Sequence, residues 1–239
     1  MALLTPRPLA GLAHMPGYLR QFRAYRRLDR GGQVRWSDTY PCLTDAVAHT
    51  PFDPHYFYQS AWLARRLAAR SPQLHVDVGS SVIAMSVLSA AIPLVFLDYR
   101  PVRTALSGFS AVSASITQLP FMTGGVESIS SLHVLEHIGL GRYGDPLDVA
   151  GSQRGAAELE RVTSTGGRIY ISVPVGRERV CFNAHRVFAA DTVTNWFQQC
   201  HLTEFSFVDD NGRFHENQPV EAVPKLEYGC GMFIFEKIQ

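Results

Sequence analysis

Long apolar runs, clustered cysteines and an excess of charge are all missing from this chain of 239 residues. No apolar run approaches the roughly 18 to 20 residues that a membrane-spanning helix needs. The formal net charge of +1 at pH 7 argues against general nucleic-acid binding. The four cysteines are widely spaced and contain no C-x-x-C pair, which favours reduced thiols over a disulfide framework or a zinc site. They are Cys42, Cys181, Cys200 and Cys230.

The N-terminal part of the chain contains prolines and basic residues. The segment MALLTPRPLAGLAHMPG (1–17) is interrupted by three prolines and is a poor signal peptide, so we expect a cytoplasmic protein. Tyr18–Asp29 is predicted to form an amphipathic helix, and His55–Arg70 a second one. Residues 1–72 are therefore expected to form an N-terminal helical cap. The basic side of the first helix (Tyr18–Arg30) is either a solvated surface or a contact for an anionic membrane or an acidic partner.

The stretch LHVDVGSSVIAMSVLSAAIPLVFLDYR (74–100) has the pattern of a strand, a tight turn, a helix and a second strand. The first strand, His75–Val78, ends at Gly79, and Asp98 ends the second about 20 residues later. This spacing is typical of open parallel sheets that hold a ribose, because the glycine lets a ligand approach the backbone and the carboxylate accepts hydrogen bonds from ribose hydroxyls. The same glycine also ends many ordinary strand–helix turns, and that alternative remains open.

The turn departs from the fingerprint of dinucleotide-binding sites. Ser81 and Ala84 occupy the positions of its second and third glycines, so a pyrophosphate would be poorly held and NAD or FAD is disfavoured. S-adenosylmethionine has no phosphate and needs fewer glycines. A nicotinamide oxidoreductase remains a third possibility.

Strand and helix patterns alternate along the rest of the chain, which predicts a doubly wound, mostly parallel sheet in residues 73–239. A late pair of strands without an intervening helix indicates one antiparallel member. Further strands are expected at 114–117, 126–132, 168–173, 205–208 and 232–236, and helices at 82–91, 152–162 and 191–199. Asp191 is the expected N-cap of the last helix.

Five segments follow one another along the second half of the chain: DVGSS (77–81), the acid Asp98, LPF (119–121), SSLHVLEHIG (130–139) and ELERVTSTGGRIYISVP (158–174). In their order and spacing they resemble the class I S-adenosylmethionine-dependent methyltransferases, and the resemblance covers residues 73–238. The blocks LHVLEHIGLGRYGDPLD (132–148) and PVGRERVCFNAHRVF (174–188) look like the methyltransferase-like family of domain of unknown function 268. The resemblance implies a seven-stranded, Rossmann-like sheet and S-adenosylmethionine as cofactor.

The resemblance also implies contacts for each part of the cofactor. Gly79 and Ser80 would approach the methionine, Asp98 the ribose, and Leu119–Phe121 the adenine. Two positions depart from the pattern, because Ser81 replaces the second loop glycine and Ser115 stands where many relatives have an acid. The full cofactor-binding prediction comprises Asp77, Gly79, Ser80, Ser81, Asp98, Tyr99, Leu119, Pro120, Phe121, His133 and Glu136.

Histidine suits the proton transfer that methylation of a hydroxyl requires, because its ordinary pKa is near 6.5. His137 follows the fourth strand, where the reacting methyl group would lie, and His185 follows the fifth. We interpret both as candidate catalytic residues; a hydrogen-bonded structural histidine is the alternative for His137. Glu136 either binds the amino group of the cofactor, orients His137 or caps a following helix.

His133, Glu136 and His137 also match H-x-x-E-H, a zinc-peptidase motif that requires a continuous helix. Here the residues follow a strand and run into Gly139 and Gly141, so this function is disfavoured. Two carboxylates in the next loop, Asp145 and Asp148, are too few for Mg²⁺. No metal site is predicted.

Polar residues in two loops after the fourth and fifth strands are expected at the rim of the site. The predicted acceptor-binding residues are Arg142, Tyr143, Asp145, Asn183 and Arg186. The sequence thus predicts methyl transfer to a small polar acceptor such as a sugar hydroxyl in glycan assembly. The alternative is a catalytically inactive relative that acts as a binding or scaffold protein.

Overall fold

The computed structural model describes residues 11–100, 102–223 and 225–238. It divides into two compact units, Met1–Phe52 and Asp53–Gln239. The division differs from the boundary expected at residue 72, because helix α3 (Pro54–Arg70) is part of the second unit. Trp62 of this helix is buried in the core, and its indole N–H donates a hydrogen bond to Glu204 at 2.8 Å.

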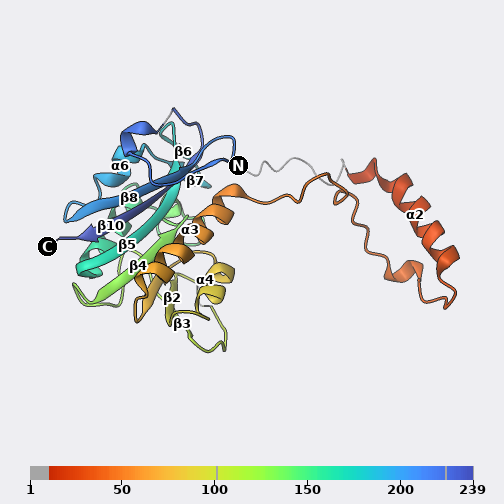
Figure 1. The fold of residues 1–239 in the computed structure, drawn as a ribbon, viewed down its shortest axis with the longest axis horizontal. Coiled ribbons are helices and arrows are strands. Elements are labelled where there is room, and N and C mark those ends of the chain that lie inside the picture. Colours follow the sequence, from red (N-terminus) through yellow and green to blue (C-terminus); the bar gives the residue numbers. More distant parts are fainter. Residues whose placement is uncertain (1–10, 101, 224, 239) are drawn as a thin grey trace. The chain divides into compact units, whose positions relative to one another are not determined.

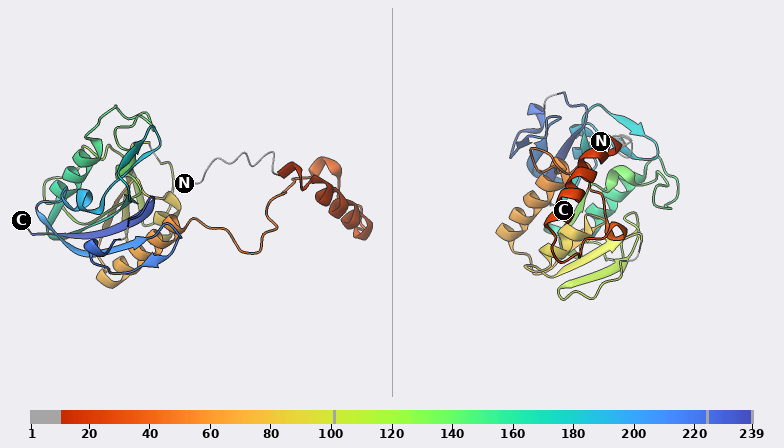
Figure 2. Two further views of the ribbon diagram at one scale, coloured as in Figure 1. Left: turned by 90° about the horizontal axis from the view of Figure 1, so that it is seen from above. Right: turned by 90° about the vertical axis from the view of Figure 1, so that its right-hand side faces the viewer.

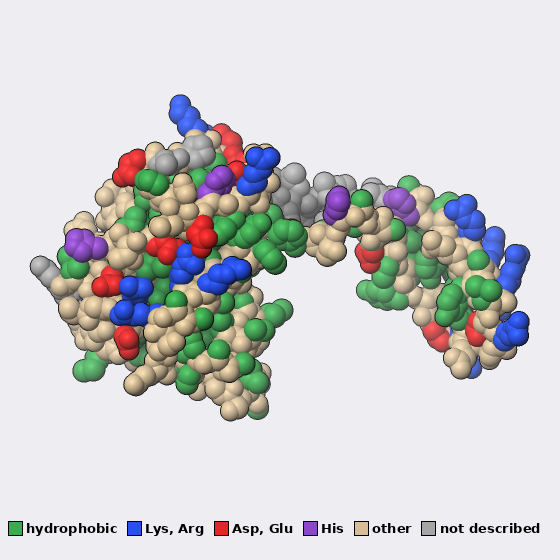
Figure 3. Space-filling view, viewed as in Figure 1, with side chains coloured by type: hydrophobic (Ala, Val, Ile, Leu, Met, Phe, Trp, Pro, Cys, Tyr) green, Lys and Arg blue, Asp and Glu red, His purple; other side chains and the backbone are tan. Residues whose placement is uncertain are grey.

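The first unit contains helix α2 (Met15–Leu28) and a short 3-10 helix, η1 (Trp36–Asp38). The rings of Phe22 and Trp36 meet edge to face with their centroids 5.2 Å apart. The arginines of α2 are exposed, and basic side chains gather along this helix in the space-filling view (Figure 3). None of the helices in the described ranges combines the length and the hydrophobicity needed to cross a membrane.

The second unit is built on one mixed sheet, drawn in Figure 1. Within the described residues the sheet has eight strands in the order β3-β2-β1-β4-β5-β10-β8-β9, rather than the seven expected. The extra member, β9, is a two-residue edge strand. The strands are β1 (His75–Val78), β2 (Leu94–Asp98), β3 (Phe109–Ser113), β4 (Val126–Leu132), β5 (Thr163–Val175), β8 (Cys200–Val208), β9 (Phe214–His215) and β10 (Gly229–Lys237).

The first five strands pair in parallel, and β10 runs antiparallel to both of its neighbours. This confirms the predicted doubly wound, mostly parallel architecture. The boundaries predicted for β1 and β4 are also confirmed. A separate hairpin of β6 (Arg179–Cys181) and β7 (His185–Val187) follows β5.

Helices cover both faces of the sheet, as the two views of Figure 2 show. Two apolar clusters form the core. The first packs α3 and α4 (Val82–Leu88) on one face of the sheet, and the second packs α5 (Gly151–Val162) and α6 (Ala190–Thr194) on the other face. Successive strand residues point to opposite faces, so Tyr170 packs in the first cluster while Ile169 and Ile171 pack in the second.

Two predicted elements were wrong. The third strand is β3, residues 109–113, and the predicted segment 114–117 instead enters a turn closed by a bridge between Ser115 and Gln118. The last helix ends at Thr194, and Ala189 rather than Asp191 is its N-cap. In β3 only Phe109 is buried, so the strand lies at an edge and carries little of the hydrophobic pattern that identifies strands.

The topology brings distant segments to one edge of the sheet. The parallel strands β1, β2, β4 and β5 all end there, whereas the antiparallel β10 begins there, with Cys230 opposite Pro174. Helix α3 runs along this sheet, and the hydroxyl of Ser172 donates a hydrogen bond to Gln59. Ligands of open α/β sheets bind at this edge.

Candidate cofactor and acceptor site

A crevice opens at the carboxyl ends of β1, β2 and β4. Its walls include six of the residues predicted from the sequence: Gly79, Asp98, Tyr99, His133, His137 and Tyr143. The remaining lining residues are Val78, Leu97, Arg100, Ala114, Ile116, Val134 and Ile138.

Gly79 has a backbone conformation that favours glycine, with φ of +74°. A Cβ atom at this position would lie 3.1 Å from the Cγ1 atom of Val134. The glycine therefore keeps the first turn close to the segment after β4 and leaves its backbone open to the crevice.

The carboxylate of Asp98 lines the crevice at the end of β2. It accepts hydrogen bonds from the backbone N–H of Arg100 at 2.7 Å and from the Nε of the same residue at 3.3 Å. The guanidinium of Arg100 in turn lies 4.4 Å from the centroid of the Tyr143 ring. Arg100 thus connects the carboxylate to the loop after β4.

Asp77, Ser80 and Ser81 shape the turn instead of lining the crevice. The buried Asp77 carboxylate accepts hydrogen bonds from the N–H and the hydroxyl of Ser80 at 3.1 and 2.6 Å. The Ser80 oxygen accepts a bond from the N–H of Leu132 at 2.9 Å, and Ser81 caps α4. These bonds hold the turn between β1 and α4 against the end of β4.

Behind the turn lies a buried polar chain. The hydroxyl of Ser130 donates to Asp77 and accepts a bond from His75 at 2.8 Å, and the other ring nitrogen of His75 lies 2.8 Å from the Ser128 oxygen. Burial lowers the pKa of His75 to about 3 and raises the pKa of Asp77 to about 6. His75 is therefore a neutral imidazole near pH 7.

His133 follows β4 and adopts a left-handed conformation, with φ of +55°, which is uncommon for a residue with a side chain. Its Nδ1 lies 2.6 Å from the Oε1 atom of Glu136, which is fully buried. Burial lowers the pKa of His133, but Cys230 and Glu136 outweigh it and raise that pKa well above its ordinary value. The surroundings of the His133 ring therefore favour positive charge.

His137 ends the 3-10 helix η2 (Leu135–His137) and is nearly buried. Its Nδ1–H donates a hydrogen bond to the carbonyl oxygen of Ala184 at 2.7 Å, which leaves Nε2 as the proton-accepting nitrogen of the neutral ring. Burial lowers the pKa of His137 despite the nearby Glu136. The bond to Ala184 also brings the neighbouring His185, at the start of β7, to the same region.

In the loop after β4 (residues 139–148), several polar groups form hydrogen bonds within the protein. The carboxylate of Asp145 accepts hydrogen bonds from the N–H groups of Gly139 and Tyr143 at 2.7 and 3.3 Å. Arg142 donates to the carbonyl oxygen of Ala184 at 2.9 Å. The ring of Tyr143 meets that of His137 edge to face at 5.7 Å. This loop and the β6–β7 hairpin therefore form one wall beside His137.

The two acceptor-binding residues predicted on the hairpin have different surroundings. Arg186 is buried and donates hydrogen bonds to the carbonyl oxygens of Ile138 and Asp148 at 2.7 and 3.2 Å, so it ties the hairpin to the loop after β4. Asn183 is exposed.

The three residues predicted against adenine do not line the crevice. Leu119 is buried, and its N–H donates to Glu158 at 2.7 Å. Pro120 is exposed, and Phe121 packs against the core beneath the sheet. Ala114 and Ile116, earlier in the same connection, line the crevice in their place.

Comparison with known proteins agrees with this architecture. A family model described as "Caenorhabditis protein of unknown function, DUF268" matches residues 104–209, which include both blocks that resemble this family. The fold is that of the class I S-adenosylmethionine-dependent methyltransferases. No curated protein matches the sequence significantly.

Three solved structures illustrate the likeness, and at these identities they establish the fold alone. The N-methyltransferase NodS from Bradyrhizobium japonicum, in complex with S-adenosylhomocysteine, is 15% identical over 77% of this chain and 88% of its own, with a TM-score of 0.52. The Burkholderia thailandensis 1,6-didemethyltoxoflavin-N1-methyltransferase is 12% identical over 100% and 93%, with a TM-score of 0.52. The [4+2]-cyclase SpnF is 12% identical over 74% and 81%, with a TM-score of 0.51.

Sequence reasoning missed several residues around His133. The His55 ring lies parallel to that of His133 with centroids 5.5 Å apart, and Tyr228 lies 5.3 Å beyond His55. Burial and the neighbouring His133 lower the pKa of His55 to about 4. His55 and Tyr228 stand outside every motif. Only the docking of α3 on the sheet and the antiparallel pairing of β10 with β5 bring them near His133. Arg100 directly follows Asp98-Tyr99 and could have been suspected from that position.

Proposed function

We propose that this chain transfers a methyl group from S-adenosylmethionine to a small polar acceptor, with a hydroxyl compound such as a sugar as the favoured class. The observation that carries the proposal is that Gly79, Asp98 and His137, from three different parts of the chain, line one crevice. The class I fold supports the choice of cofactor.

The residues present fit this cofactor. The open backbone at Gly79 leaves room for the methionine part, and the Asp98 carboxylate is suited to accept hydrogen bonds from ribose hydroxyls. We place the adenine against Ala114 and Ile116 rather than at Leu119–Phe121. When bound, the cofactor supplies an electrophilic methyl group on a sulfonium.

The chain's own part in the reaction is to bind the acceptor, align it and remove its proton. The backbone of Ala184 fixes the orientation of His137, and the lowered pKa keeps its Nε2 free to take a proton from an acceptor hydroxyl. We assign His185 to catalysis beside His137, and Arg142 and Asn183 to binding of the acceptor; Arg142 shares the carbonyl oxygen of Ala184 with His137. Glu136, which lies 3.8 Å from Nε2, stabilises the protonated ring once the proton has moved.

Calorimetric titration of the full chain with S-adenosylmethionine and S-adenosylhomocysteine tests the cofactor. Binding by the wild type, lost in Asp98→Ala and kept in Glu127→Ala, would support the proposal. Glu127 is a suitable control because it is exposed at the opposite end of β4. Labelled-methyl transfer to a panel of sugars then tests the acceptor. Absence of binding by the folded wild type would contradict the proposed activity.

A second candidate is a non-catalytic binding protein. It is favoured by the engagement of Asp98 with Arg100, which occupies one of the two carboxylate oxygens that a ribose would use. The likeness to a cyclase also indicates that this fold alone does not dictate methyl transfer. If the chain is such a binding protein, Asp98→Ala should leave its binding to a protein partner unchanged.

A further inference from the structure

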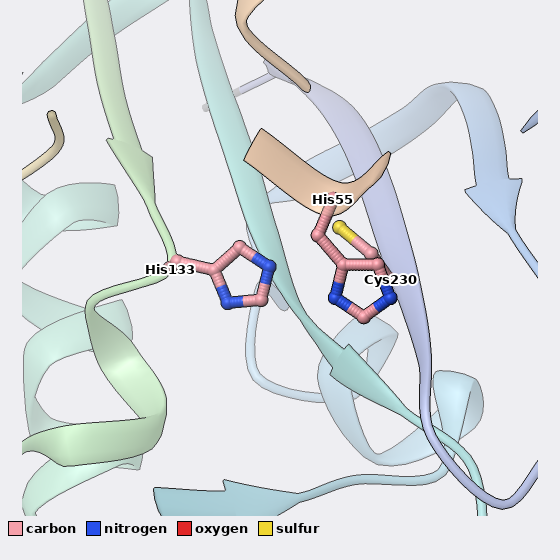
Figure 4. A group of neighbouring side chains, drawn as sticks. All are labelled: His55, His133 and Cys230. Atoms are coloured by element: carbon pink, nitrogen blue, oxygen red, sulfur yellow. The ribbon is translucent and has the colours of Figure 1, made fainter. Parts of the chain in front are cut away.

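Three potential metal ligands from distant parts of the chain meet on the α3 side of the sheet (Figure 4). A ring nitrogen of His55, a ring nitrogen of His133 and the Sγ atom of Cys230 all lie within 4.8 Å of one another. We propose that these three side chains bind a zinc ion. The site adjoins the crevice described above, because His133 lines the crevice as well.

Each ligand is delivered by a different element. His55 lies in the first turn of α3, whose N-cap is Asp53. Cys230 is the second residue of β10 and is fully buried. His133 directly follows β4, and its left-handed backbone turns the chain at this point. Because β10 is antiparallel, its first residues lie beside the carboxyl end of β5 and close to the end of β4.

An independent observation points to a ligand at this position. The Nε2 atom of His133 is buried and has no hydrogen-bond partner among the described residues. In Figure 4 a nitrogen of this ring is directed toward the His55 ring, with the Cys230 sulfur beside it. A buried polar atom without a partner is costly, and a bound ion would satisfy it.

Glu136 prepares His133 for this role. Its Oε1 atom lies 2.6 Å from Nδ1 of His133, so Nδ1–H donates to the carboxylate and Nε2 is the nitrogen left to bind a metal. Carboxylates commonly orient metal-binding histidines in this way. Binding of the metal releases any proton carried by Nε2 and by the Cys230 thiol.

The donor set selects the ion. Two imidazole nitrogens and one thiolate suit zinc, whereas Mg²⁺ and Ca²⁺ require oxygen ligands. Three protein ligands leave one position of a tetrahedral zinc open, as in catalytic zinc sites. His133 also lines the crevice, so this open position would adjoin the proposed acceptor site and could bind an acceptor hydroxyl or thiol. The proposal departs from the expectation from sequence that no metal site is present.

Cobalt(II) is the probe, because it replaces zinc and its absorption reports thiolate ligation. The chelator-treated full chain is titrated with Co²⁺ and then with Zn²⁺, and metal content is measured on the protein. We expect one equivalent of Co²⁺, a sulfur-to-cobalt charge-transfer band, and displacement by Zn²⁺. Cys230→Ser should remove the band, and His55→Ala should weaken binding roughly tenfold or more.

Two matched controls and a folding check complete the test. Cys200→Ser and His201→Ala change residues on β8 and should bind as the wild type does. Circular dichroism shows whether each variant is folded, and His55 is only partly buried, so its loss is the safer variant. Less than stoichiometric binding by the folded wild type, or binding unchanged in both ligand variants, would overturn the site. The titration needs no S-adenosylmethionine, so its outcome is independent of the proposed function.

Discussion

The guanidinium of Arg100 lies 4.4 Å from the ring centroid of Tyr143, and so connects the segment after β2 to the loop after β4. Both residues line the crevice, and Arg100 also donates to the carboxylate of Asp98. This stacked pair therefore lies across the position that we assign to the ribose. A cofactor that bonds to the Oδ1 atom of Asp98 would have to displace the Arg100 side chain.

Removal of the Arg100 side chain should accordingly ease cofactor entry. In Arg100→Ala we expect S-adenosylmethionine to associate several-fold faster than in the wild type, because the stacking and the bond from Nε are both lost. Tyr143→Leu should behave similarly, whereas Tyr143→Phe keeps the aromatic ring and should match the wild type. Stopped-flow measurement of binding checks this. Slower association in Arg100→Ala would mean that the guanidinium attracts the ligand instead.

Gly79→Ala should destabilise the protein through two separate effects. The positive φ costs about 1–2 kcal/mol for a residue with a Cβ atom, and the contact with Val134 at 3.1 Å adds to it. Gly124→Ala is the matched control, because Gly124 has φ of +69° but no atom within 4 Å of its Cβ position. Urea unfolding should rank Gly79→Ala as the less stable variant. In a Val134→Ala background, the cost of Gly79→Ala should shrink to that of Gly124→Ala, and an unchanged cost would exclude the contact as a cause.

The buried His75 should make folding sensitive to acid. Its pKa is about 3 in the folded state and near 6.5 when unfolded, so the unfolded chain binds more protons between these values and stability falls as pH decreases from about 6.5. The raised pKa of Asp77, about 6, acts in the opposite direction between about 6 and 3.8. Comparison of the wild type with His75→Gln separates the contribution of the histidine to this pH dependence from that of Asp77.

The stability advantage of the wild type over His75→Gln should shrink as pH falls from 7 to 4.5. The greatest slope for one group is about 1.4 kcal/mol per pH unit. Urea unfolding at several pH values measures it. If the two proteins lose stability in parallel, then His75 does not remain neutral in the folded state at these pH values.

Glu204 should contribute more to stability than Glu216, although both bind Arg66. Glu204 accepts hydrogen bonds from Arg66 and from the Trp62 indole at 2.7 and 2.8 Å, and its side chain is 17% exposed. The Glu216 side chain is 53% exposed. We expect Glu204→Gln to cost about 1–2 kcal/mol and Glu216→Gln less than about 0.5 kcal/mol in urea unfolding. Equal effects would mean that α3 is not anchored through the indole and the partly buried carboxylate.

His137→Gln should separate catalysis from cofactor binding. Loss of the proton acceptor should lower turnover about 10²- to 10⁴-fold, while the affinity for S-adenosylmethionine changes little. Steady-state kinetics and calorimetry, with the exposed His201→Gln as control, give the two quantities. Unchanged turnover would mean that His137 is not the proton acceptor and that its role is the structural hydrogen bond to the carbonyl oxygen of Ala184.

The sequence alone was sufficient for much of the fold because its signals are local. The run from His75 to Val78, the turn at Gly79 and the acid Asp98 predicted the first strand–helix–strand unit, and the structure has it there. Strand β2 is an almost continuous apolar run that can be recognised without its neighbours, and β1 is marked by its two valines and the glycine after it. The edge strand β3 and the β6–β7 hairpin lack such runs, and they were missed.

The site depended on tertiary structure to a greater degree. Side-chain direction decided that Ser80 bonds to Asp77 instead of lining the crevice, and that Arg186 is buried against carbonyl oxygens. The meeting of His55, His133 and Cys230 spans more than half of the chain, and no spacing along the sequence encodes it. The residue types in the sequence determined which side chains can bind or react. The antiparallel pairing of β10 with β5 and the packing of α3 on the sheet determined which of these side chains lie together.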